Sequence, residues 1–162
     1  MFRRISLATV LAGTIAMAAM APALAGEQRP YQASFSGMGV AVEQRCGPDA
    51  LTLGFDVTGV ATHMGRFTAF GTNCTEFTLA TQAVAIWDGI IRVRAADGST
   101  LTFSSVGHQD AAADGVAQAY QTLTVVSGTG RFDGAAGVLE LVSTVDFATF
   151  TTEGTVSGWL SF

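Results

Sequence analysis

Strict alternation of apolar and polar side chains is the feature that most constrains the fold of this chain. Segment 51–58 reads LTLGFDVT, so every odd position is apolar and every even position is small or polar. A period of two is typical of a β-strand with one buried face. Residues 26–162 contain no stretch of about ten or more residues with helical periodicity, and Thr, Val, Phe and Gly dominate there. The sequence therefore predicts an all-β protein.

Other segments with strand character bring the expected number of strands to about eight. Two alternating runs, 90–95 and 99–106, flank Asp97-Gly98 and predict a hairpin, because glycine accepts the positive φ of such a turn. The remaining strands are expected at about 31–42, 60–72, 75–87, 118–126, 138–150 and 154–161. We expect an eight-stranded antiparallel barrel, because closure removes exposed sheet edges, with a β-sandwich as an alternative.

Residues 1–25 have the features of a secretory signal peptide. Arg3 and Arg4 precede an apolar stretch at 5–20, and the small-x-small triplet 23–25 follows it. The apolar stretch is shorter than the ~20 residues that a membrane-spanning helix needs. We expect cleavage after Ala25, a secreted or periplasmic protein without a membrane span, and a single barrel domain at 26–162.

The mature chain is expected to be acidic. Cleavage would leave 137 residues with six Arg, no Lys and all 13 acidic residues, so losing Arg3 and Arg4 changes the net charge from −5 to −7. Binding of nucleic acids and of anionic membrane surfaces requires clustered Lys or Arg. Nucleic acid is therefore excluded as an expected partner.

Cys46 and Cys74 are the two cysteines of the chain. An oxidising compartment favours a disulfide between them, worth about 3 to 4 kcal/mol on the chain-entropy estimate. A metal pair or a redox dithiol would need further ligands or a Cys-x-x-Cys spacing. We expect no metal and no cofactor.

Segment 128–137 reads GTGRFDGAAG and concentrates glycine around one arginine and one phenylalanine. The residues of this structural motif are Gly128, Gly130, Arg131, Phe132, Gly134 and Gly137. Its glycines suit a tight connection between strands, its phenylalanine could plug a barrel end, and its arginine could pair with a nearby carboxylate or carbonyl. A phosphate-binding loop is disfavoured, because the Walker and dinucleotide patterns need a different sequence and a neighbouring helix.

This motif resembles the Gly-Thr-Gly-x-Phe-x-Gly-Ala-x-Gly segment of the allene oxide cyclase and dirigent barrels, especially of the small secreted bacterial members. Segment 153–159, EGTVSGW, is similar to the closing strand of that family. The resemblance implies an antiparallel barrel with an apolar central cavity, and a homo-oligomer that is a trimer by analogy with plant members. A lipocalin-like barrel is the structural alternative, although Gly37–Val40 stands where lipocalins have Gly-x-Trp.

Residue types suggest where a ligand or a reaction could be placed. Ligand-lining candidates are the aromatic residues Phe55, Phe67, Phe103 and Trp159. Catalytic candidates are His63, expected in a strand on the same face as Phe67, and the carboxylates Glu140 and Asp146, whose pKa would rise inside an apolar barrel.

Three functions remain open from the sequence. The leading prediction is a barrel that binds a small hydrophobic ligand in its cavity without chemistry of its own. The second is a cyclase or isomerase that steers ring closure of a hydrophobic substrate. The third is a structural or envelope-interaction protein with a filled core.

Overall fold

A computed structural model describes residues 26–78 and 83–162 of the chain. The predicted signal peptide, residues 1–25, lies outside the described residues. The described chain forms an eight-stranded barrel in which each strand pairs antiparallel with its neighbours along the chain. The strands are β1 (Gln28–Val40), β2 (Leu51–Ala61), β3 (Gly65–Thr78), β4 (Ala83–Ala95), β5 (Thr100–Gln109), β6 (Val116–Thr129), β7 (Ala136–Asp146) and β8 (Thr151–Ser161).

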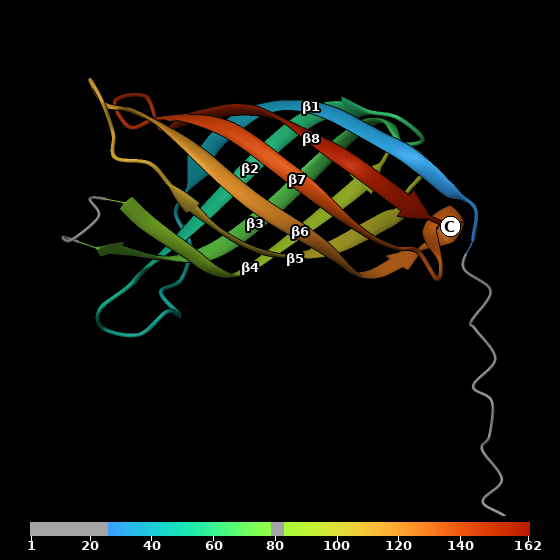
Figure 1. Ribbon diagram of the computed structural model, residues 1–162, viewed down its shortest axis with the longest axis horizontal. Helices are drawn as coiled ribbons and strands as arrows, with labels where there is room; N and C mark the ends of the chain where they lie inside the picture. The colour runs from blue at the N-terminus through green and yellow to red at the C-terminus, as the bar shows by residue number, and fades with distance from the viewer. Residues whose placement is uncertain (1–25, 79–82) are drawn as a thin grey trace, which may run out of the picture.

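Pairing of the first and last strands closes the barrel (Figure 1). The ladder runs from Gln28 opposite Ser161 to Met38 opposite Thr151. A closed sheet leaves no strand edge unpaired, and this was the reason for predicting a barrel from the sequence. The all-β barrel is therefore confirmed, and the β-sandwich alternative is wrong.

The hairpin expected at 90–106 is present as the end of β4, a tight turn and β5. Gly98 has φ +88° and its N–H donates to the carbonyl of Ala95 at 2.9 Å. The Asp97 carboxylate accepts a hydrogen bond from the backbone N–H of Ser99 at 3.0 Å. Glycine is required at the turn because other residues rarely adopt this positive φ.

The three strands expected at 60–72, 75–87 and 90–95 are two strands, β3 and β4. The expected breaks near Asn73 and Asp88 are β-bulges, where the register shifts without ending the strand. Asp88 takes a positive φ of 48°, and a Cβ on Gly89 would lie only 1.9 Å from Ser105 Oγ. Aspartate and glycine therefore mark a bulge here and not a turn.

The strand expected at 138–150 ends earlier, at Asp146. The Asp146 carboxylate accepts hydrogen bonds from the backbone N–H groups of Ala148 (2.8 Å) and Thr149 (3.2 Å). These bonds fold residues 147–150 into the β7–β8 turn, because an aspartate side chain offers the backbone an alternative to the sheet ladder.

The two ends of the barrel differ. The closed end, as we call it, is formed by the β2–β3, β4–β5 and β6–β7 connections, and the mouth is formed by the β1–β2, β5–β6 and β7–β8 connections. A short 3-10 helix, η1 (Gly130–Phe132), lies in the β6–β7 connection. Phe132 has no exposed surface and meets the Phe162 ring edge-on at 5.2 Å between centroids. An aromatic side chain thus fills the closed end.

Arg131 links the connections of the closed end. Its guanidinium donates to the carbonyl oxygen of Met64 at 3.3 Å and pairs with the Asp97 carboxylate at 3.0 Å. The chain returns so closely here that a Cβ on Gly128 would lie 1.9 Å from the Phe132 carbonyl oxygen. Only glycine permits that approach, which explains the glycine at position 128 of the motif.

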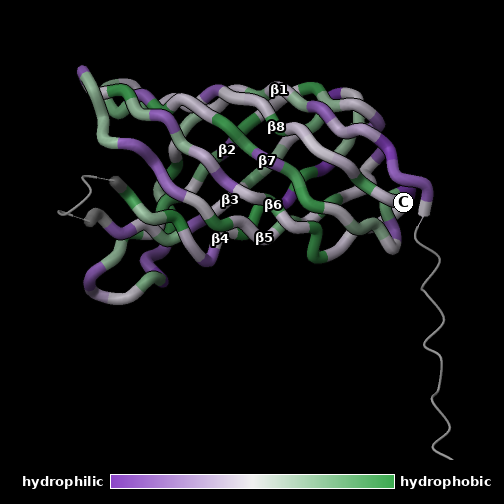
Figure 2. The backbone as a smooth tube through the Cα atoms, viewed as in Figure 1, coloured by the Kyte–Doolittle hydropathy of each residue, from purple (hydrophilic) through white to green (hydrophobic). Residues whose placement is uncertain are grey.

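Apolar side chains also lie on the outer wall of the barrel. Hydrophobic and hydrophilic positions are interspersed along the strands (Figure 2). Val138 and Trp159 are paired across β7 and β8, and both side chains are more than half exposed. The homo-oligomer stays a prediction.

Within the two described ranges, no helix is long and apolar enough to cross a membrane.

Candidate ligand cavity

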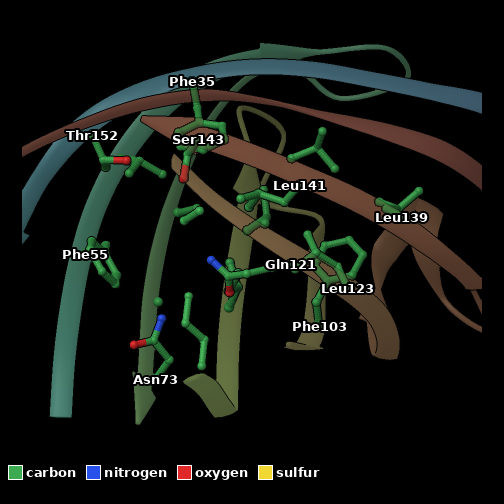
Figure 3. Close-up of a pocket in the computed structure, with 18 of the residues that line it drawn as sticks. Phe35, Phe55, Asn73, Phe103, Gln121, Leu123, Leu139, Leu141, Ser143 and Thr152 are labelled. Carbon is green, nitrogen blue, oxygen red and sulfur yellow. The ribbon is translucent and has the colours of Figure 1, made fainter. Parts of the chain in front are cut away.

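The barrel encloses a cavity of about 100 Å³ that is lined by side chains from all eight strands (Figure 3). Most of the lining is aliphatic or aromatic. Toward the closed end it is formed mainly by Tyr31, Phe67, Val93, Phe103, Leu123 and Leu139. This wall continues into the apolar core that Phe132 completes.

The half of the cavity nearer the mouth contains neutral polar side chains. They are Thr72, Asn73, Thr75, Gln109, Gln121, Ser143 and Thr152, and they come from β3, β5, β6, β7 and β8. Phe35, Leu53 and Phe55, from β1 and β2, provide an apolar wall in the same half. The cavity therefore has a floor that is apolar apart from the Tyr31 hydroxyl, and a mixed upper part.

Two side-chain oxygens of the cavity lining are buried and have no hydrogen-bond partner among the described residues. They are Asn73 Oδ1 and Gln121 Oε1. The hydroxyl of Ser105 is also buried without a partner, but it packs against Gly89 in the barrel wall. Since most buried polar groups in folded proteins are hydrogen-bonded, the two amides are unusual features of the lining.

The cavity lining is uncharged at physiological pH. Tyr31 is its one ionisable residue within the described part of the chain, and burial raises its pKa to about 12. The Tyr31 hydroxyl donates to the sulfur of Met64 at 3.4 Å. Desolvation disfavours the phenolate, so the hydroxyl stays protonated.

The four ligand-lining candidates divide between the two faces of the barrel wall. Phe55, Phe67 and Phe103 line the cavity. Trp159 instead lies on the outer wall with 56% of its surface exposed. The alternation of β8 explains the difference, because the inward position next to it is taken by Leu160, which is fully buried.

The three catalytic candidates lie outside the cavity. His63 was expected in a strand, but it lies in the β2–β3 turn. Its Nε2 is 3.1 Å from the carbonyl oxygen of Pro30. Glu140 faces solvent because its neighbours in β7 face inward, and it accepts a hydrogen bond from the Thr122 hydroxyl at 3.4 Å. Hydrogen bonds from two backbone N–H groups lower the pKa of Asp146, whereas burial in an apolar barrel would have raised it.

The polar part of the lining is what sequence reasoning missed. A signal for Gln121 was present, because Gln121 lies at the same alternation phase as the buried residues Ala119 and Leu123. Asn73 carried the same signal, because it lies at the same alternation phase as the buried residues Phe67 and Ala69 of β3, although the register of that strand shifts between Thr72 and Cys74.

A disulfide between Cys46 and Cys74, predicted from the sequence, lies at the mouth with a Cα–Cα distance of 5.5 Å. It fastens the β1–β2 connection to β3 at the residue that follows Asn73. Arg45, in the same connection, pairs with the Asp88 carboxylate and donates to the Asp88 carbonyl oxygen at 2.6 Å. These contacts hold the β1–β2 connection against one side of the mouth.

Comparisons with known proteins identify a solved structure with a similar fold. No protein-family model matches the chain, and no curated protein matches its sequence. Among solved structures, the pterocarpan synthase dirigent protein GePTS1 is similar, with a TM-score of 0.54, 14% sequence identity, and coverage of 87% of this chain and 94% of that one. The chain therefore has a dirigent-like barrel fold. At this level of identity the likeness establishes the fold alone.

Proposed function

We propose that this protein binds a small hydrophobic molecule inside its barrel. The observation that carries the proposal is the apolar cavity of about 100 Å³. Protein interiors are close-packed, and an unfilled apolar cavity lowers stability. A concave apolar space with a few polar groups is the usual form of a small-molecule site. The volume is about two thirds of that of a ~150 Å³ cavity that binds benzene, so it limits the buried part of a ligand to one small ring.

A cyclase or isomerase that steers a hydrophobic substrate is the second candidate. It is favoured by the fold, since GePTS1, which shares the barrel, is a pterocarpan synthase. Proton transfer inside this cavity is disfavoured, because Tyr31 is the one ionisable residue of the described lining and its pKa is about 12. A group that transfers protons needs a pKa near the working pH. Steering by shape is the form of this candidate that the lining supports.

A structural barrel with a filled core is the third candidate. The unfilled cavity counts against it, because a purely structural barrel gains stability from side chains that fill its interior.

We also propose that the protein is exported to the periplasm or the medium. The disulfide between Cys46 and Cys74 supports this, because disulfides form and persist in oxidising compartments. Mass spectrometry of the protein from its natural host tests it. A mature chain beginning at Gly26 in the exported fraction is the expected result, and a full-length chain retained in the cytoplasm would contradict it.

Native mass spectrometry, before and after denaturation and organic extraction, tests the binding function directly. The protein is purified from its natural host so that a resident ligand is retained. We expect a small neutral molecule that is lost on denaturation. A ligand-free protein that also fails to bind toluene in solution would overturn the proposal and favour the filled structural barrel.

A variant that fills the cavity should abolish toluene binding. Ala119 is buried and lines the cavity, so Ala119→Leu adds three carbon atoms to the ligand space. Gln118→Leu, at the exposed neighbouring position of β6, is the matched control. Isothermal titration should show no toluene binding by Ala119→Leu and unchanged binding by Gln118→Leu. Equal binding by both variants would place the toluene site elsewhere.

A further inference from the structure

The two amide oxygens without partners carry an inference about the chemistry of the ligand. Asn73 is only 5% exposed, and its Oδ1 and the Oε1 of Gln121 are fully buried. Figure 3 shows both side chains projecting into the cavity. Each amide interrupts a row of apolar inward residues, such as Ala69 on β3 and Leu123 on β6. Apolar residues would fill these positions if packing alone decided them.

The surroundings hold Asn73 in place. It occupies the bulge of β3 and immediately precedes Cys74, which the disulfide fixes to the β1–β2 connection. Gln121 lies in a continuous part of the β6 ladder, opposite Gly107 on β5 and Leu141 on β7. The two amide side chains are therefore carried by separate strands, each at a fixed backbone position.

Charge and polarity then limit what these acceptors can bind. A carbonyl oxygen of an amide accepts hydrogen bonds, so its partner must bring an O–H or N–H group. A cation would bring such a donor, but the described lining contains no carboxylate to compensate its loss of hydration. The floor of the cavity is apolar apart from the Tyr31 hydroxyl, which donates to the sulfur of Met64, whereas the amides lie in the half nearer the mouth.

We propose that the ligand is a neutral molecule with an apolar body and a hydroxyl or N–H group, which donates to Asn73 Oδ1 or Gln121 Oε1 after the side-chain amide rotates to turn that oxygen, buried in the ligand-free barrel, toward the cavity. Its apolar body lies toward the closed end, and its donor lies toward the mouth. This inference rests on the proposed binding function and adds a requirement for a hydrogen-bond donor. It assigns Asn73 and Gln121 as specificity-determining residues.

A series of one-ring probes separates the two proposals. Toluene has no donor, benzyl alcohol has one, benzyl methyl ether has an oxygen but no donor, and benzylammonium has donors and a positive charge. We expect benzyl alcohol to bind about five- to tenfold more tightly than benzyl methyl ether, the difference that one net hydrogen bond produces. We expect benzylammonium to bind most weakly. Isothermal titration measures all four affinities.

The outcomes are distinguishable. If none of the four probes binds, the proposed binding function fails and this inference fails with it. If toluene binds but benzyl alcohol binds no more tightly than its methyl ether, cavity binding stands and the donor requirement is wrong. If benzylammonium binds most tightly, the inference of a neutral ligand is wrong.

Two substitutions assign the effect to the amides. Asn73→Leu and Gln121→Met remove the acceptors with little change in side-chain volume. Each should reduce the preference for benzyl alcohol over its methyl ether, and the double variant should abolish it while still binding toluene. Toluene binding shows that the variant is folded around an intact cavity. Gln118→Met, which removes an amide from the outer face of β6, is the control and should keep the preference. A preference that persists in the double variant would overturn the assignment.

Discussion

At the scale of single residues, the polar groups of the cavity reduce the stability of the ligand-free protein. A buried amide oxygen without a partner loses its hydrogen bonds to water and gains none in the fold. Asn73 Oδ1 and Gln121 Oε1 are both in this position. Binding residues that weaken the empty fold are a common compromise between function and stability.

Replacing Asn73 by an apolar residue should therefore stabilise the ligand-free protein. We expect Asn73→Leu to raise the free energy of unfolding by about 1 kcal/mol, with a higher melting temperature, because an unsatisfied polar group is removed. Urea unfolding of the wild type and the variant measures the difference. Gln118→Leu, on the outer face, loses only a solvent-exposed hydrogen bond to the Thr144 hydroxyl and should change stability by less than about half as much. A clear loss of stability in Asn73→Leu would show that the wild-type amide is well satisfied.

Arg131 should contribute to stability through the closed end. Arg131→Met keeps much of the aliphatic chain but loses the bonds to the Met64 carbonyl and the Asp97 carboxylate. We expect a loss of about 1 kcal/mol in urea unfolding. Arg66→Met, on another arginine of the barrel, has no such set of contacts among the described ion pairs and serves as the control. Equal stability of the two variants would contradict the linking role of Arg131.

The sequence allowed the apolar part of the cavity to be predicted better than its polar part. Phe55, Phe67 and Phe103 follow from alternation within a strand, which depends on local sequence alone. Trp159 is also aromatic, but its position in the alternation of β8 turns its side chain outward. A large aromatic side chain does not by itself indicate which face of a strand it occupies. Asn73 shares the inward phase of Phe67 and Ala69 in β3, but that phase does not say that its amide oxygen is left without a partner, because hydrogen bonding depends on residues from other strands.

At the scale of elements, a hairpin with a short turn could be predicted from the sequence, but the ends of the long strands could not. Asp97-Gly98 and Asp88-Gly89 look alike in the sequence, yet the first makes a turn and the second makes a bulge. Both use a positive φ, and the choice between them is made by register with distant strands. Local sequence therefore indicates where the backbone is unusual, but not whether the strand continues.

The β7–β8 turn should make the stability of the barrel depend on pH. Backbone N–H groups of Ala148 and Thr149 lower the pKa of Asp146 below its ordinary value of 3.8. Its carboxylate therefore stabilises the fold above pH 4 or so, and this contribution is lost as pH falls through the lowered pKa of the folded state. Asp146→Ala should lose less stability than the wild type between about pH 5 and pH 2.5. Parallel urea curves at several pH values test this, and identical slopes with pH in both proteins would contradict it.

At the scale of the whole molecule, the barrel combines a packed closed end with a mouth fastened by a disulfide. The closed end is filled by apolar side chains, whereas the mouth depends on contacts of the β1–β2 connection with β3 and β4. The fold class was predictable because alternation and turns recur along the entire chain. The volume of the cavity was not, because it depends on how inward side chains from eight strands fit together.

Removing the disulfide should lower stability by about 3 to 4 kcal/mol, because the bridge restricts the unfolded chain between residues 28 positions apart. The Cys46→Ser/Cys74→Ser double variant and the reduced wild type should unfold at the same lower urea concentration. Oxidised wild type is the reference. An oxidised wild type that is no more stable than the double variant would show that the bridge adds nothing to the fold.

Methyl NMR can show whether a small hydrophobic molecule binds inside the barrel. The mature protein, with labelled Leu and Val methyl groups, is titrated with toluene. We expect shifts and ligand contacts at Leu123, Leu139 and Val156, which line the cavity, with little change at Val60 and Val126 on the outer wall. Shifts confined to the outer wall, or no saturable shifts at all, would contradict it.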